Sequence, residues 1–173
     1  MGYTTWTVTA LEVPNATKWN LLGLNDASFN DGTGIADGVI TPDKLGLGAV
    51  RSRINTAESR SSTSYGALST AQSVTAIIGA NGLALVSLSS FFSASNSSEL
   101  SYFSFVVSGA NTIAVSDNNA IILKASSTGT MGLIGKTILL TGLSEGSTTF
   151  TVQVKNTVGT STYAAREITV VPL

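Results

Sequence analysis

The stretch STTFTVQVK, residues 147–155, alternates polar and apolar side chains along its length. From residue 150 on, one side of the alternation carries apolar groups: Phe150, Val152 and Val154. The other side carries polar groups: Thr149, Thr151, Gln153 and Lys155. A period of two is that of a β-strand with one face in a core and the other in water. We therefore predict a half-buried strand here, and the same pattern decides the fold of the chain after residue 60.

Several other segments have the same character. Residues 101–107 place Phe103, Phe105 and Val107 on one face, and residues 163–171 place Ile168 and Val170 inward. Further short strands are predicted at residues 73–78, 83–89, 113–115, 120–123 and 136–141. We expect hairpin turns at Asn81-Gly82 and at residues 142–146, since Gly and Asn tolerate the backbone angles of tight turns. Because no long helix separates these strands, the sequence predicts an all-β fold, an antiparallel sandwich or barrel.

The composition excludes several kinds of site. The 173 residues include no His and no Cys, so disulfides, the usual zinc, haem and iron–sulfur ligand sets, and His- or Cys-dependent catalysis are ruled out. The formal net charge is −1, which provides no basic footprint for nucleic acid. Charged residues make up only 11% of the chain against 43% hydrophobic residues. Such a chain stays dispersed if its β-structure is closed and its outward faces carry Ser and Thr.

The chain divides near residue 60. Residues 12–60 hold eleven charged side chains, whereas residues 61–173 hold eight that sum to zero. We predict an N-terminal anchoring arm at residues 1–60 and a β domain at residues 61–173. The arm lacks sustained periodicity, so it is either disordered or ordered by docking on other chains, and spaced apolar residues favour docking. Its predicted anchors are Trp6, Trp19, Leu22, Phe29, Ile35, Ile40 and Leu45.

Local patterns within the arm predict a strand at residues 3–10 and a helix start at Thr41-Pro42-Asp43-Lys44, where Thr41 caps and Pro42 fits the first helical position. Residues 51–60 are predicted to be a short helix or an extended connector. The Asn- and Asp-rich loop at residues 25–38 leaves calcium binding open, although its spacing matches no EF-hand.

Catalytic motifs in the β domain are weak. Residues 142–146, GLSEG, match the G-x-S-x-G pattern, but strands are predicted on both sides and the chain has no His to serve as base. A glycosidase would need a pair of carboxylates. The acids after residue 60 are predicted to lie in turns or at strand ends, where they are solvated: Glu99, Asp117, Glu145 and Glu167. We therefore predict no enzymatic activity and no cofactor.

Targeting and membrane segments are not predicted either. The first twenty residues lack a basic region followed by an apolar run, and the longest apolar stretch, residues 83–92, is interrupted by three serines.

Two regions resemble a known group of proteins. Residues 19–38, beginning Trp19-Asn20-Leu21-Leu22-Gly23, are similar to the N-terminal part of tailed-bacteriophage minor structural proteins. The region from Ser64 to the end resembles the C-terminal β domain of phage fibre and head-decoration proteins. Its most telling pieces are residues 72–86, 139–143, 150–152 and 166–173. The resemblance implies a jelly-roll-like domain, often trimeric, preceded by an arm that anchors to the particle, with no catalytic residues to transfer. Arg166-Glu167 departs from related domains, which are more basic there.

These lines together predict a homotrimeric capsid-decoration or short-fibre protein on the surface of a virion. Its partners would be copies of itself and other virion proteins such as capsid or tail proteins. The alternative is a receptor- or glycan-binding fibre or adhesin module that recognises host-surface glycan through its loops. The candidate recognition residues are Asn96, Asp117, Asn118 and Asn119.

Overall fold

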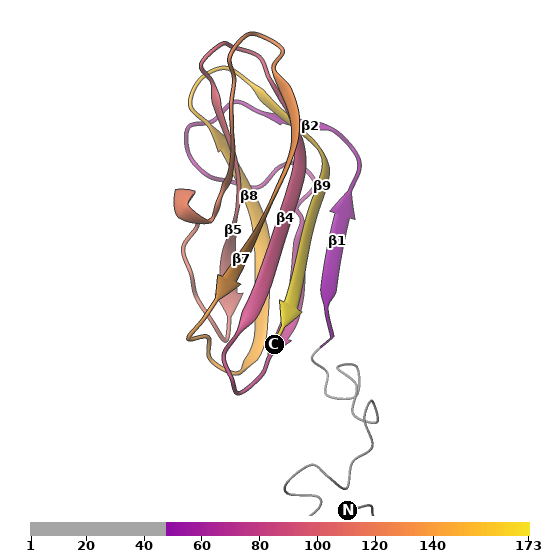
Figure 1. Ribbon diagram of the computed structural model, residues 1–173, viewed down its shortest axis with the longest axis vertical. Helices are drawn as coiled ribbons and strands as arrows, with labels where there is room; N and C mark the ends of the chain where they lie inside the picture. The colour runs from indigo at the N-terminus through magenta and orange to yellow at the C-terminus, as the bar shows by residue number, and fades with distance from the viewer. Residues whose placement is uncertain (1–47) are drawn as a thin grey trace, which may run out of the picture. The chain divides into compact units, whose positions relative to one another are not determined.

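The computed structural model describes residues 48–173, which fold into two facing β-sheets (Figure 1). Sheet A has the strand order β1-β9-β4-β7, with β2 also paired to β9, and sheet B has the order β3-β8-β5-β6. The strands of sheet A are β1 (Val50–Ile54), β2 (Glu58–Arg60), β4 (Ala84–Ala94), β7 (Met131–Leu140) and β9 (Ser161–Pro172). Those of sheet B are β3 (Ser73–Ile78), β5 (Leu100–Gly109), β6 (Ile121–Lys124) and β8 (Gly146–Asn156). A short 3₁₀ turn, η1 (Asp117–Asn119), precedes β6.

The pairing is that of a long hairpin rolled up on itself. β1 pairs with β9, β3 with β8, β4 with β7 and β5 with β6, all antiparallel, so that in the sequence each pair encloses the one named after it. Rolling this hairpin brings β9 beside β4 and β8 beside β5, which completes the two sheets. This nested order is a jelly roll, and it confirms the all-β, jelly-roll-like sandwich predicted from the sequence.

The core fills the space between the sheets. Phe150, Val152 and Val154 are at most 3% exposed, as the alternation in residues 147–155 predicts. Phe103 and Phe105 on β5 are fully buried. Phe92 meets Phe103 and Tyr163 edge-on, with ring centroids 6.4 and 5.5 Å apart. Side chains from both sheets therefore interlock, and this burial provides the main driving force for folding.

The two ends of the sandwich differ. At one end, here called the base, the Leu143 amide donates to the Gly82 carbonyl at 3.0 Å and the Leu173 amide to Leu83 at 3.1 Å. Val50, at the start of β1, pairs with Val170 near the same end. At the opposite end, called the tip, lie the loops of residues 95–99, 125–130 and 157–160, which are joined by backbone hydrogen bonds.

The two predicted hairpins at the base are wrong. The turn at Asn81-Gly82 joins β3 in sheet B to β4 in sheet A, and residues 141–145 join β7 in sheet A to β8 in sheet B. Gly82 does adopt a positive φ of 64°, so the turn itself is present. Each flanking strand must bury its apolar face against the opposite sheet, so the chain crosses over the end of the core instead of folding back beside itself.

The sandwich begins before residue 61. β1 and β2, which the sequence placed in the arm as a helix or connector, are strands that pair with β9. The arm anchors Trp6, Trp19, Leu22, Phe29, Ile35, Ile40 and Leu45 lie outside the described residues, as do the strand at residues 3–10 and the helix start at Thr41.

A bulge in β9 turns a charged side chain into the interior. The pairing of β9 with β4 shifts by one residue between Ser89 and Phe91, and Ala165 there has a φ of 45°. The bulge changes which side chains face inward, so that Arg166 joins Ile168 and Val170 on the buried side at 1% exposure. Arg166 donates to Glu58 at 3.0 Å. Burial opposes ionisation of Glu58, but the Thr70 amide and Arg166 hold the pKa of its carboxyl below the ordinary value.

Removing the carboxylate from this pair tests how much the buried arginine depends on it. We expect Glu58→Ala to lower the free energy of unfolding by about 3–5 kcal/mol, because Arg166 would be left buried without its counter-charge. Arg51→Ala is the control, since Arg51 pairs with Glu167 at an exposed site, and it should cost less than about 1 kcal/mol. Urea unfolding of both variants measures the difference, and equal losses would contradict this account.

Candidate functional site

Metal-ligating side chains do not gather in the described part of the chain. Within residues 48–173, no group of three or more metal-ligating side chains comes together, and no helix is long and apolar enough to span a membrane. Three of the acidic side chains are held in ion pairs: Glu58 binds Arg166, Asp117 binds Lys155 and Glu167 binds Arg51. The functional features to consider are therefore surfaces.

The first surface is a polar and aromatic cluster on the outer side of sheet B. Lys155 on β8 lies 4.7 Å from the ring centre of Tyr65 and 4.5 Å from that of Tyr102, which stands opposite it on β5. Its ammonium is 2.7 Å from Asp117 in η1, and the Tyr65 hydroxyl donates to the same carboxylate at 2.9 Å. Gly66 forms a bridge with Val154, which carries the Tyr65 segment across β8.

This cluster is internally satisfied. Lys155 donates to the Asp117 carboxylate and so keeps the pKa of that carboxyl below the usual range. Burial raises the pKa of the Tyr65 phenol, and acceptance by Asp117 raises it further. Tyr102 is only 8% exposed. The two rings thus stand edge-on to each other, with the lysine over both of them.

The second surface is the tip. The Ser98 amide donates to the Ala125 carbonyl at 2.9 Å, and the Ser95 amide donates to Thr160 at 3.1 Å, so three loops form one surface. The exposed tip residues are uncharged, and most carry a hydroxyl or amide group. The structure places Asn96 here, whereas Asp117, Asn118 and Asn119 lie in η1 beside sheet B. The four candidate recognition residues therefore do not share one site.

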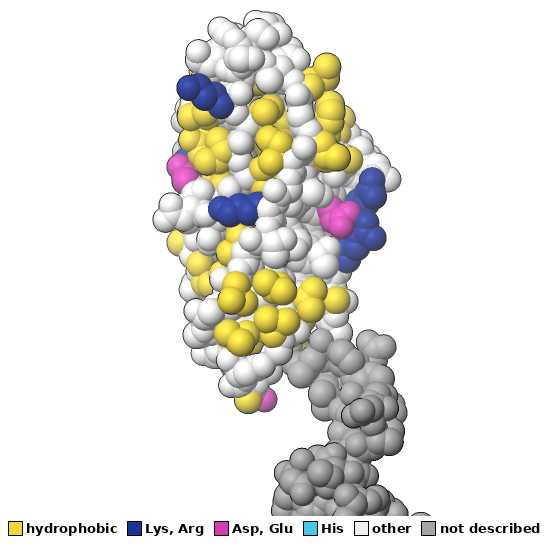
Figure 2. Space-filling model, in the orientation of Figure 1, with side chains coloured by type: hydrophobic (Ala, Val, Ile, Leu, Met, Phe, Trp, Pro, Cys, Tyr) yellow, Lys and Arg dark blue, Asp and Glu magenta, His cyan; other side chains and the backbone are white. Residues whose placement is uncertain are grey.

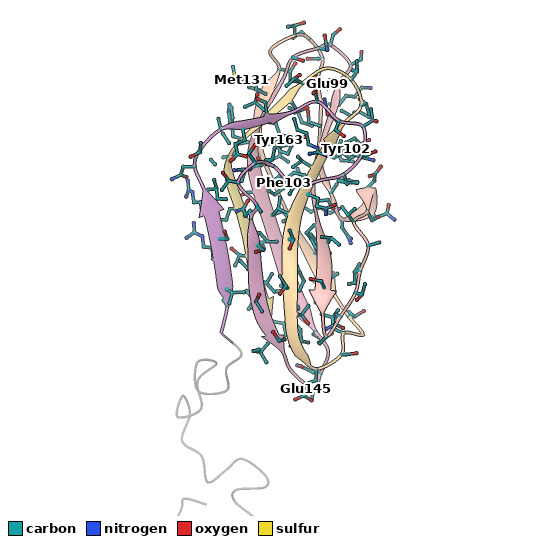
Figure 3. All side chains as sticks on the ribbon, turned by 180° about the vertical axis from the view of Figure 1, so that it is seen from behind. Glu99, Tyr102, Phe103, Met131, Glu145 and Tyr163 are labelled. Atoms are coloured by element: carbon teal, nitrogen blue, oxygen red, sulfur yellow. The ribbon has the colours of Figure 1, made fainter. Side chains whose placement is uncertain are left out.

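A buried carboxylate holds the tip together. Glu99 is fully buried, contrary to the expectation that the acids of the β domain are solvated. Its Oε2 accepts from the amides of Ser95 and Asn96, each at 3.1 Å, and its Oε1 accepts from Asn156 Nδ2 at 3.2 Å and from the Ser161 hydroxyl (Figure 3). These neutral donors replace the water that the carboxyl group loses on burial, and they tie the loop to β8 and β9.

The sequence contained only part of this information. Glu99 is followed directly by a strand, and nothing in the local pattern distinguishes a carboxylate that folds back under its own loop from one in water. Arg166 differs, because it occupies the same alternate positions of the strand as Ile168 and Val170. This alternation indicates that its side chain points inward.

The third surface is the outer face of sheet A, which is apolar and nearly uncharged over β4 and β7. Met131, Leu133 and Leu139 on β7 are 65%, 69% and 54% exposed. Figure 2 shows apolar groups on this face toward the tip and toward the base. The charged side chains that the strands of sheet A direct outward lie on β1 and β9, where Arg51 donates to Glu167 at 2.6 Å and so lowers the pKa of that carboxyl.

Comparison with known proteins identifies the fold. No known protein family and no curated protein matches the chain. A structure of infectious bursal disease virus, Gx strain, is similar with a TM-score of 0.53 at 12% identity, over 72% of this chain and 32% of that one. The VP2 subviral particle of the same virus gives 0.52 at 11% identity, over 72% and 32%. A mutant VP2 protein from derived T=1 particles gives 0.51 at 13% identity, over 80% and 35%.

The chain shares its fold with a viral particle protein. It spans about a third of the length of these VP2 chains, so the likeness concerns one β-sandwich of a larger molecule. At this level of identity the match concerns the fold alone, and function has to be argued from the surfaces of this chain.

The role of Glu99 at the tip can be tested by replacing one oxygen of its carboxyl group with an amide nitrogen. In Glu99→Gln, an N–H group must face either the Ser95 and Asn96 amides or Asn156, so buried donors lose their acceptor. We expect a loss of about 2 kcal/mol or more in the free energy of unfolding and faster hydrogen exchange at the Ser95 and Asn96 amides. Glu145→Gln, in the exposed turn at the base, is the matched control and should change neither quantity. Unchanged exchange in Glu99→Gln would contradict the role assigned to this carboxylate.

Proposed function

We propose that this chain is a non-enzymatic structural protein of a virus particle: a homotrimeric capsid-decoration or short-fibre protein of a tailed phage. It docks on capsid or tail proteins through its N-terminal arm and displays its β domain at the particle surface. The nested jelly-roll order carries the proposal, because it is the fold found here in VP2 particles. The resemblance of residues 19–38 to phage minor structural proteins supports the phage assignment.

The surfaces of the domain fit this role. The carboxylates of Glu58, Asp117 and Glu167 are bound to cations of the same chain, and Glu99 is buried. The exposed apolar side chains of β7 lie on the outer face of sheet A. Apolar, weakly charged faces suit association with other copies, and closed symmetry limits such association to a defined assembly.

The trimer can be measured directly. We expect the full-length chain, of 17.7 kDa, to sediment with about three times this mass, because a closed threefold arrangement covers its apolar faces without forming an open fibre. Analytical ultracentrifugation over a range of concentrations is the measurement. A stable single-copy mass throughout that range would remove the trimer from the proposal.

The anchoring role belongs to residues 1–47 and can be separated from folding. A chain that begins at Gly48 keeps β1 through β9, so its β domain should retain its far-ultraviolet circular dichroism spectrum and unfold cooperatively. We expect this variant to be absent from assembled particles, whereas the full chain is incorporated. Particles are purified after co-expression with the other virion proteins, and the copies per particle are counted by quantitative mass spectrometry.

A full-length chain in which Trp6, Trp19 and Phe29 are replaced by Ala identifies the side chains responsible, and should be lost from particles to a similar degree. Full-length Glu145→Gln is the control and should be incorporated normally. If the truncated chain is incorporated as efficiently as the full chain, the arm is not the anchor.

The runner-up function is recognition of a host-surface glycan at the tip. The observation that favours it is the clustering of exposed Ser, Thr and Asn side chains from three loops, which offer neutral hydrogen-bond donors and acceptors of the kind that match sugar hydroxyls. Binding of the full chain to a glycan array, abolished by Asn96→Ala, would favour this function. A copy number of hundreds per particle would favour decoration instead.

A further inference from the structure

The free edge of sheet A is formed by β7, whose outward side chains are Met131, Leu133, Gly135, Thr137 and Leu139, here called the β7 stripe. Its two ends are apolar and its middle is small or polar. Leu133 stands opposite Phe91 on β4, and Leu139 stands opposite Leu85. An apolar group thus lies at each end of the stripe, as Figure 2 shows on the face formed by β7, β4 and β9.

The backbone of the β7 stripe is also available for pairing. Among residues 48–173, β7 pairs with β4 alone. At the tip, the Ala94 amide donates to the Thr130 carbonyl at 3.0 Å, and the register runs Ser93 opposite Met131. In an antiparallel ladder, alternate residues direct both backbone groups to the same neighbour. Even-numbered residues of β7 therefore bond to β4, and the odd-numbered residues of the stripe direct their N–H and C=O groups outward.

Outward charged side chains are one common protection of an exposed edge strand against pairing. No residue of the β7 stripe is charged, and neither is any outward residue of β4 beside it. The charged residue of β7 is Lys136, which faces the other way and donates to the carbonyls of Asn118 at 2.6 Å and Ala120 at 3.4 Å. This ammonium is thus tied to the loop before β6, and it leaves the outward face of the strand uncharged.

We propose that β7 is a contact between two copies of this chain, in which their β7 strands pair antiparallel about a two-fold axis at Gly135. Met131 and Leu139 lie four residues to either side of Gly135. The two-fold therefore sets Met131 opposite the second copy's Leu139, and Leu133 opposite its Thr137. The tip-side apolar group of one copy then continues into the base-side group of the other, and all of these residues direct their backbone groups toward the partner.

Neighbouring registers are less favourable. A shift by one residue in the pairing turns inward side chains toward the outer face. Moving the axis to residue 136 sets Lys136 opposite Lys136 of the second copy. Moving it to residue 134 leaves Leu139 without a partner residue in the other copy's β7. An axis at Gly135 pairs as many residues of β7 as an axis at residue 136, and it sets no like charges against each other.

The size of the contact indicates where it operates. Ten residues of strand span about 34 Å, and a sheet is about 10 Å deep, so edge pairing covers on the order of 340 Å² per copy. A stable free dimer covers about 800 Å² per partner. The β7 contact is thus suited to join copies already held in a larger assembly. It does not depend on the proposed trimer, whose threefold contact must use other surfaces.

The complete absence of Cys allows a direct test. Full-length Leu133→Cys and Thr137→Cys variants are prepared separately, mixed at high concentration so that a contact of this size is populated outside a larger assembly, and oxidised under mild conditions. Directly opposed, hydrogen-bonded residues have Cα atoms about 5.5 Å apart, within the range of a disulfide. We expect the mixture to form a covalent heterodimer roughly tenfold or more faster than either variant alone, because pairing holds the two thiols together.

The matched control is a mixture of Thr75→Cys and Ser147→Cys, which places exposed thiols on the outer face of sheet B. Maleimide labelling first establishes that all four thiols react. If the two mixtures cross-link at the same rate, the β7 contact is wrong. A single-copy mass in solution together with rapid cross-linking would retain the β7 contact and remove the trimer, and a trimeric mass without selective cross-linking would do the reverse.

Discussion

The pairing of β9 with its neighbours is the interaction on which the sandwich depends. β9 bonds to β1, β2 and β4, so it joins the last strand of the chain to the first ones and closes the rolled hairpin. Its inward side chains supply Tyr163, Ile168 and Val170 to the core, each fully buried. Since the contacts of β9 with β1 and β2 join segments more than a hundred residues apart, the sheet cannot form from one part of the chain alone.

The bulge at Ala165 shows how one local irregularity decides chemistry elsewhere. Without the extra residue, the side chains on one half of β9 would face the opposite way. With it, both halves bury apolar groups, and Arg166 becomes an interior cation that binds Glu58 at the end of the β1–β2 segment. A buried ion pair of this kind contributes little net stability but makes the correct arrangement specific, because any other packing leaves a charge unpaired.

The fold class was predictable because period-two alternation is a local signal. Residues 101–107, 147–155 and 163–171 each show which side chains are inward, and the structure agrees at Phe103, Phe150 and Ile168. The sheet partners were not predictable, because Asn81-Gly82 has the same local chemistry whether the next strand lies beside the last one or across the core. β1 and β2 were missed for a related reason: the Arg and Glu side chains at residues 51–60 conceal strands that exist only because β9 pairs with them. Glu99 at the tip was missed because its donors come from β8, β9 and its own loop.

The described domain also has a clear polarity along its long axis. Val50 and Leu173 lie together at the base, beside the turns at Gly82 and Leu143, while the loops of residues 95–99 and 125–130 are at the far end. An epitope inserted between Ser126 and Gly129 would therefore project outward from the tip, about a full strand length from the base. The same epitope appended after Leu173 would crowd the place where the chain enters β1. For anyone using this molecule as a scaffold, the grafting position is the outer loop and not the carboxyl terminus.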